Sequence, residues 1–165
     1  MKNPAEELVT AWLQERGYFT MNNKKVPRKG GGMGAEIDIL ATNRKKNIWV
    51  EVSVSTNPRC NYLKETRFKS TVGHYASNFR RKDKNQKVRS YFGKNYEKWL
   101  VYGKLALTVT EKDKFEKALL KKGVKAIQFG KIFGELRSLR GYRLDTARGY
   151  MNLFEAFHEE RICSI

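Results

Sequence analysis

The sequence predicts an α/β fold in which helices flank a central mixed β-sheet. Segments with helical spacing of apolar residues alternate with short segments rich in β-branched and aromatic residues. Their order is helix, three strands, helix, strand, helix, strand, helix, which is typical of a sheet covered by helices. The chain has 165 residues without an internal repeat or an obvious linker, so we expect one domain over residues 1–165.

The first part of the chain is predicted to form one helix and three strands. Residues 4–16 place Leu8 and Trp12 on one helical face, Pro4 suits the first turn, and Gly17 ends the helix. The segments that follow are a strand at 18–23, a basic glycine-rich loop at 24–34, a strand at 35–41, a polar hairpin turn at 42–47 and a strand at 47–55.

The later part of the chain is predicted to alternate between helices and strands. The expected segments are a helix at 62–82, a strand within 98–109, a helix at 111–123, a strand at 124–130, a turn or short helix at 131–141 and a helix at 150–161. The basic stretch at 80–95 shows no clear periodicity, so no structure is assigned to it.

Charge and composition narrow the classes of function. The chain has 34 Lys and Arg against 17 Asp and Glu, a formal net charge of +17, which favours a polyanionic partner such as nucleic acid. No apolar run approaches the roughly 20 residues of a membrane span, and no basic amphipathic helix favours a membrane surface. We therefore expect nucleic acid, and no membrane, as the partner.

Cysteine content and the N-terminus bear on the compartment. Cys60 and Cys163 are isolated, so they provide neither a disulfide framework nor the spacing of a zinc site. The opening "MKNPAEELV" lacks the apolar segment of a secretory signal. We therefore expect a cytoplasmic protein.

Three acids lie inside the apolar segments of the predicted hairpin. Glu36 and Asp38 belong to "AEIDILA", and Glu51 belongs to "IWVEVSVS", with Ser53 two positions later. Alternate residues of a strand share a face, so Asp38 and Glu51 can converge in a hairpin. Two carboxylates and a backbone carbonyl, such as that of Val52, are hard oxygen ligands that suit Mg²⁺. A structural network of salt bridges is the alternative.

Two basic stretches are candidates for contact with phosphate groups. The first contains a glycine run, which either lets the backbone approach a phosphate closely or forms a solvated loop. The second is interleaved with aromatic residues, which either stack on bases or belong to the core. The candidate residues are Lys24, Lys25, Arg28, Lys29, Arg80, Arg81, Lys82, Lys84, Lys87 and Arg89.

The segments "AEELVTAWLQERGY", "AEIDILA" and "WVEVSV" resemble the core of the PD-(D/E)XK, or restriction-endonuclease-like, nuclease superfamily. They are most similar to the small archaeal Holliday junction resolvases, which carry an acid on the first helix, an Asp on one strand and Glu-x-Lys on the next. The resemblance covers roughly the first half of the chain. It implies a Mg²⁺- or Mn²⁺-dependent endonuclease that hydrolyses phosphodiester bonds, with DNA favoured over RNA, and a homodimer.

The resemblance also implies roles for single residues. Asp38 and Glu51, thirteen positions apart as in the small resolvases, match the metal-binding acids, and Val52 would add its carbonyl. Glu6 matches the helical acid, which would bind the metal through water or position that water. Glu36 would be a supporting acid.

The departure from the family pattern is Ser53, which stands where the motif has its lysine. That lysine would orient the attacking water or stabilise charge in the transition state, and serine carries no charge. Three interpretations remain open. The lysine has moved, with Lys64 and Lys69 as candidates; Ser53 holds a water and acts as a catalytic residue while the metal does most of the work; or the chain is an inactive nuclease-fold protein that binds nucleic acid.

Overall fold

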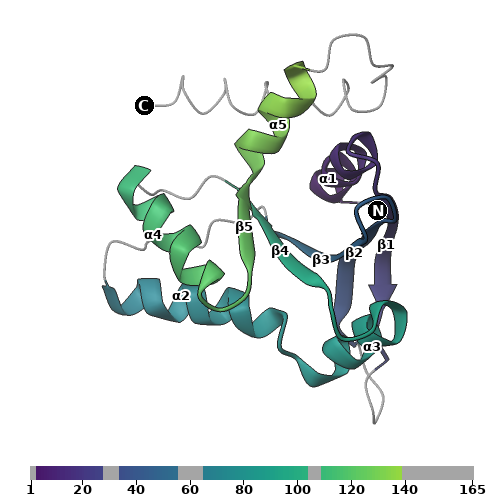
Figure 1. Cartoon of the computed structure of the whole chain (residues 1–165). Coiled ribbons are helices and arrows are strands. Elements are labelled where there is room, and N and C mark those ends of the chain that lie inside the picture. Colours follow the sequence, from purple (N-terminus) through teal and green to yellow (C-terminus); the bar gives the residue numbers. More distant parts are fainter. Residues whose placement is uncertain (1–2, 28–33, 56–64, 104–108, 139–165) are drawn as a thin grey trace.

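A computed structural model describes residues 3–27, 34–55, 65–103 and 109–138 (Figure 1). The elements in this part of the chain are α1 (Pro4–Glu15), β1 (Phe19–Lys25), β2 (Glu36–Asn43), β3 (Ile48–Ser55), α2 (Glu65–Asn78), α3 (Lys82–Phe92), β4 (Glu97–Tyr102), α4 (Val109–Leu120), β5 (Lys125–Gln128) and α5 (Phe129–Ser138). The helix expected at 150–161 lies outside the described residues.

The strands form one mixed sheet in the order β1-β2-β3-β4-β5. β1 to β3 pair antiparallel, and β3 to β5 pair parallel. The predicted fold class, with its α-β-β-β-α-β order, is therefore confirmed. The helix α3 is an addition that the sequence did not predict.

Helices cover both faces of the sheet (Figure 1). On one face, α1 and α5 pack against alternate residues of β3 and β4, such as Val52 and Val101. On the other face, α2 and α4 pack against the intervening residues of β4, Leu100 and Tyr102. Glu51 alternates with Val52 and therefore faces the side of α2 and α3.

Local features determine where α1 begins and ends and how the chain turns between β2 and β3. The side chain of Asn3 accepts a hydrogen bond from the Ala5 N–H and caps α1, and Gly17 ends this helix at a φ of 77° that glycine adopts without strain. Between β2 and β3, Asn47 takes a left-handed φ of 52°, which asparagine tolerates in a tight turn. The predicted hairpin between these strands is confirmed.

The helix α3 occupies the basic stretch that had no assigned structure. It is a polar helix whose buried side chains are Lys84 and Val88, one turn apart. Val88 packs against Ile37 and Leu40 of the sheet. Its apolar residues, Val88, Tyr91 and Phe92, lie only in the second half of the helix, so the apolar pattern is too short to define the helix from sequence.

Candidate active site

Asp38 lies where β2 and β3 stop pairing. The register of the hairpin runs as far as Ile39 opposite Val52. One residue further, the Oδ2 atom of Asp38 accepts a hydrogen bond of 3.0 Å from the Ser53 hydroxyl and another of 2.7 Å from the Val54 N–H. The carboxylate thus takes the place of a backbone partner at this point and is held in a fixed orientation.

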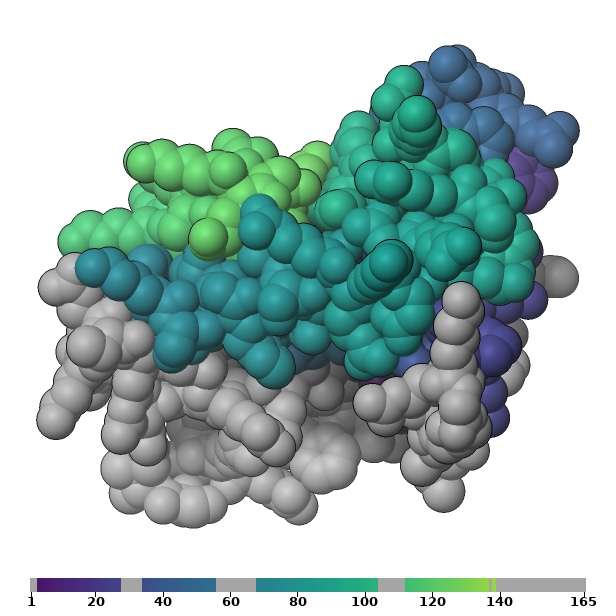
Figure 2. Space-filling view, turned by 90° about the horizontal axis from the view of Figure 1, so that it is seen from below, coloured from purple at the N-terminus to yellow at the C-terminus, as the bar shows by residue number. Residues whose placement is uncertain are grey.

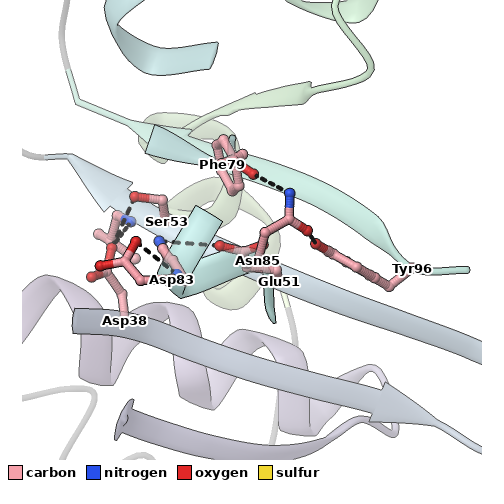
Figure 3. A network of polar contacts seen from close by, with 9 residues as sticks. Asp38, Glu51, Ser53, Phe79, Asp83, Asn85 and Tyr96 are labelled. Carbon is pink, nitrogen blue, oxygen red and sulfur yellow. Dashed lines mark hydrogen bonds and ion pairs between the residues drawn. The ribbon is translucent and has the colours of Figure 1, made fainter. Parts of the chain in front are cut away.

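Glu51 lies on the same face, diagonal to Asp38 across the hairpin. Such diagonal neighbours have Cα atoms about 7–8 Å apart. The Glu51 side chain is completely buried, and Nζ of Lys84, from α3, lies 3.1 Å from its Oε1 atom (Figure 3). Apart from Lys84, neither oxygen of Glu51 has a hydrogen-bond donor among the described residues. A buried carboxylate in this state is rare and points to a role beyond packing.

Burial dominates the electrostatics of Glu51. It raises the pKa of this carboxyl above the usual value, although Lys84 and, more weakly, Lys98 oppose the shift. Lys98 belongs to β4 and is paired with Glu51 in the register. Burial lowers the pKa of the Lys98 ammonium, while the Glu51 carboxylate acts in the opposite direction. Glu51 is therefore flanked by two lysines from different elements.

Glu6 of α1 also contributes charge at this site. Its Oε1 atom accepts a hydrogen bond of 2.9 Å from the Asn3 amide. Burial raises the pKa of the Glu6 carboxyl, Asn3 opposes this, and the charges of Asp38 and Glu36 raise it further. The helical acid of the sequence analysis is thus close enough to Asp38 to sense its charge.

The residues at the site can be compared with the needs of a divalent cation. The described part of the chain holds no group of three His, Cys, Asp or Glu side chains that could bind a metal, so Glu6 does not complete a three-acid site. Mg²⁺ is commonly held by one or two carboxylates and keeps several waters. The buried Oε2 atom of Glu51, without a hydrogen-bond donor among the described residues, and the oriented carboxylate of Asp38 fit such an ion.

The structure corrects the expectation for Lys84. The sequence analysis placed this residue on a basic surface, but its side chain is only 5% exposed because it contacts Glu51. A lysine therefore does contact Glu51, and it is Lys84 of α3, which the sequence analysis had not considered for this role. Of the two lysines considered as substitutes, Lys69 is an exposed residue of α2, and Lys64 lies outside the described residues.

The remaining basic candidates lie mainly on the surface. Figure 2 shows the face of the molecule formed by α2 and α3, to which several of them belong. Arg80, Arg81, Lys82 and Arg89 are exposed, and Lys87 is half-buried with its Nζ 5.2 Å from the centre of the Tyr91 ring. Lys25 is exposed and Lys24 half-buried on β1, whereas Arg28 and Lys29 lie outside the described residues.

The sequence analysis did not name Lys98, and it named Lys84 only as a residue of the basic surface. Lys98 could have been found, because it precedes the apolar run of β4 and shares a strand face with Leu100 and Tyr102. Lys84 shares a helical face with Val88 and Phe92, but these two apolar residues lie C-terminal to it, and a lysine is not expected to be buried.

Comparisons with known proteins give similarity in structure only. No family model matches the chain, and no curated protein sequence matches it. The chain is similar to a crystal structure described as protein of unknown function AF1548, with 18% identity, a TM-score of 0.50, and coverage of 90% of this chain and 79% of that one. This similarity concerns the fold alone.

Two further structures are more distant. A protein of the XisH family from Nostoc punctiforme PCC 73102 is 14% identical with a TM-score of 0.39, and covers 76% of this chain and 90% of its own. The restriction endonuclease PspGI, in complex with its substrate DNA, is 15% identical with a TM-score of 0.40, and covers 89% of this chain and 53% of its own. No conclusion about the site is drawn from these two. None of the described helices has the length and apolar character that a membrane crossing requires.

Proposed function

We propose that this protein is a metal-dependent endonuclease that hydrolyses phosphodiester bonds, with DNA as the favoured substrate. The observation that carries the proposal is the buried Glu51 carboxylate, which has no hydrogen-bond donor other than Lys84 among the described residues and lies beside Asp38. The Lys84 ammonium balances this carboxylate at Oε1, and Oε2, which has no donor among the described residues, remains available to a metal ion. The net charge of +17 suits a polyanionic substrate.

In this proposal Asp38 and Glu51 hold Mg²⁺ or Mn²⁺, with the carbonyl of Val52 as a third oxygen ligand. The bound ion would supply an activated water and a positive charge opposite the phosphoryl oxygens. Ser53 and the Val54 N–H keep the Asp38 carboxylate in one orientation, as groups behind a metal ligand commonly do.

Lys84 takes the role that the family assigns to the lysine at the position of Ser53. Its ammonium group fixes Glu51 and brings a positive charge to the place where negative charge develops. Glu6 would position the water or accept its proton. Its raised pKa brings it closer to neutral pH, where a general base works best.

The deciding experiment is the substitution Asp38→Asn with two measurements, Mg²⁺-dependent cleavage and melting temperature. The asparagine oxygen can still accept from Ser53 and Val54, so we expect an unchanged melting temperature. Cleavage should disappear, because a neutral amide is a poor ligand for Mg²⁺. Asp113→Asn, the same change at an exposed position of α4, is the matched control and should retain activity.

The second candidate is a nucleic-acid-binding protein without catalysis. The burial of the Glu51–Lys84 ion pair favours it, because the pair can be purely structural. Wild-type protein that binds nucleic acid but is inert with Mg²⁺ and Mn²⁺ on linear, branched and single-stranded substrates would establish this alternative.

A further inference from the structure

Asn85 of α3 joins three segments of the chain that each carry a cation. Its Nδ2 atom donates to the Phe79 carbonyl at 3.4 Å, and its Oδ1 atom accepts from the Tyr96 hydroxyl at 2.6 Å (Figure 3). Arg80 directly follows Phe79, and Arg89 lies one helical turn after Asn85. These contacts bring the end of α2, the middle of α3 and the start of β4 together.

The third cation is Lys98, which lies two positions after Tyr96. Its Nζ atom is 5.5 Å from the centre of the Tyr96 ring, so the aromatic ring positions the ammonium group. The charges of Arg80 and Arg89 both lower the pKa of Lys98, in addition to the larger effect of burial. Glu51 acts on the pKa of Lys98 in the opposite direction. The ring contact and the Asn85 hydrogen bonds are therefore what place Lys98 near the segments of the two arginines.

Glu51 offsets part of the Lys98 charge, whereas neither Arg80 nor Arg89 has an ion pair with an acid among the described residues. Glu51 pairs with Lys84 at 3.1 Å, and Asp83 pairs with Arg81 at 3.0 Å. Arg80, Arg89 and Lys98 thus form a group of like charge, and such a group lowers the stability of the folded chain. An anion bound between them would remove this repulsion.

We propose that Arg80, Arg89 and Lys98 form a binding site for a phosphate group. The two guanidinium groups are exposed and can each donate two parallel hydrogen bonds to phosphate oxygens. Lys98 adds a charge from a fixed strand at the base of the site. The claim that the phosphate belongs to a nucleic-acid backbone rests on the proposed function. The claim that the three cations bind a phosphate group does not.

The phosphate in this site would lie next to the one that is cleaved, because Lys98 pairs with Glu51 and is two strands from Asp38. Asp38 belongs to β2 and Lys98 to β4, which are separated by β3. Two strand spacings amount to about 10 Å. The site would therefore hold a neighbouring phosphate of the substrate on the β4 side of Glu51, and would fix the direction of the strand across the sheet.

The test compares the double variant Arg80→Gln/Arg89→Gln with Lys114→Gln/Lys117→Gln, which removes the same charge from exposed positions of α4. Binding to a short DNA duplex is measured in EDTA over a range of salt concentrations. The logarithm of the affinity falls linearly with the logarithm of the salt concentration. In Arg80→Gln/Arg89→Gln, the loss of one phosphate contact should make this slope less negative by about 0.9. The α4 variant should keep the wild-type slope. Because no metal is present, failure of the nuclease proposal leaves this result intact.

A second measurement identifies the source of the anion. Inorganic phosphate, compared with chloride at equal ionic strength, should raise the melting temperature of the wild type and the α4 variant but not of Arg80→Gln/Arg89→Gln. If Arg80→Gln/Arg89→Gln loses both the wild-type salt slope and the rise in melting temperature, the site binds a backbone phosphate. If it loses only the rise in melting temperature, the site binds free phosphate. Equal slopes and equal thermal shifts in the two double variants would overturn the proposal.

Discussion

The ammonium nitrogen of Lys84 lies 3.1 Å from Oε1 of Glu51, and both side chains are buried. The two residues come from α3 and β3, 33 positions apart in the sequence. This pair closes the candidate site on the side of α3. It also places a lysine beside Glu51, the acid two positions before Ser53.

Replacing Lys84 by methionine should strongly destabilise the protein. The change leaves the Glu51 carboxylate buried without its cation, which typically costs about 3–5 kcal/mol. Urea denaturation gives the free energy of unfolding. Lys82→Met, at an exposed position of the same helix, is the control and should stay within about 0.5 kcal/mol of the wild type.

The double variant Glu51→Gln/Lys84→Met completes this measurement. Because both charges are removed, its loss of stability should be smaller than the sum of the two single losses. If Lys84→Met and Lys82→Met destabilise the protein equally, the ion pair contributes nothing to the fold.

Stability should depend on pH through Glu51. Burial raises the pKa of this carboxyl above 4.5, so the folded protein binds the proton more tightly than the unfolded chain does. The free energy of unfolding should therefore fall as the pH rises from 4.5 through the pKa of the folded state. Glu51→Gln lacks this carboxyl and should not show that fall.

Denaturation in EDTA at several pH values above 4.5 tests this. The pKa of Glu6 is also raised, but Glu6 is present in both proteins and cancels in the comparison. Parallel pH profiles for the wild type and Glu51→Gln would mean that burial does not shift the pKa of Glu51.

Divalent cations should stabilise the folded protein. A ligand that binds the folded state alone, at 100 times its dissociation constant, adds about 2.7 kcal/mol. We expect Mn²⁺ to raise the melting temperature of the wild type and EDTA to reverse the effect, whereas Asp38→Asn should not respond. A response of equal size in Asp38→Asn would place the ion elsewhere.

Ser53→Ala should weaken metal binding without unfolding the protein. It removes the hydroxyl that donates to Asp38, while the Val54 N–H remains. Loss of a group that orients a metal ligand typically lowers the metal affinity about 10-fold to 100-fold. We expect the Mn²⁺ affinity of Ser53→Ala to fall by roughly 10-fold. Isothermal titration with Mn²⁺ measures this.

The matched control for that measurement is Ser55→Ala. Ser55 is on the same face of β3, but its hydroxyl lies 3.3 Å from the Tyr75 hydroxyl instead of an acid. We expect unchanged Mn²⁺ affinity in this variant. Equal weakening in both serine variants would show that the effect is not specific to Asp38.

The antiparallel hairpin and the shared face of its acids could be predicted from the sequence because they depend on local properties. Strand alternation has a period of two, and the polar turn at Asn47 fixes which residues lie opposite one another. The sequence therefore already placed Asp38, Glu51 and Ser53 together. It also predicted α1 over residues 4–16 from Pro4 and Gly17, and the helix spans Pro4–Glu15.

Only the tertiary structure decided which cations meet these acids. Lys84 reaches Glu51 because α3 packs on the sheet, and Lys98 does so because β4 pairs in parallel with β3. Both contacts join residues distant in sequence, and the apolar residues of α3 are confined to its second half, so they do not indicate that Lys84 is buried. Local patterning thus determined the strands and their acids, whereas long-range packing determined the burial, the pairing and the charge environment of Glu51.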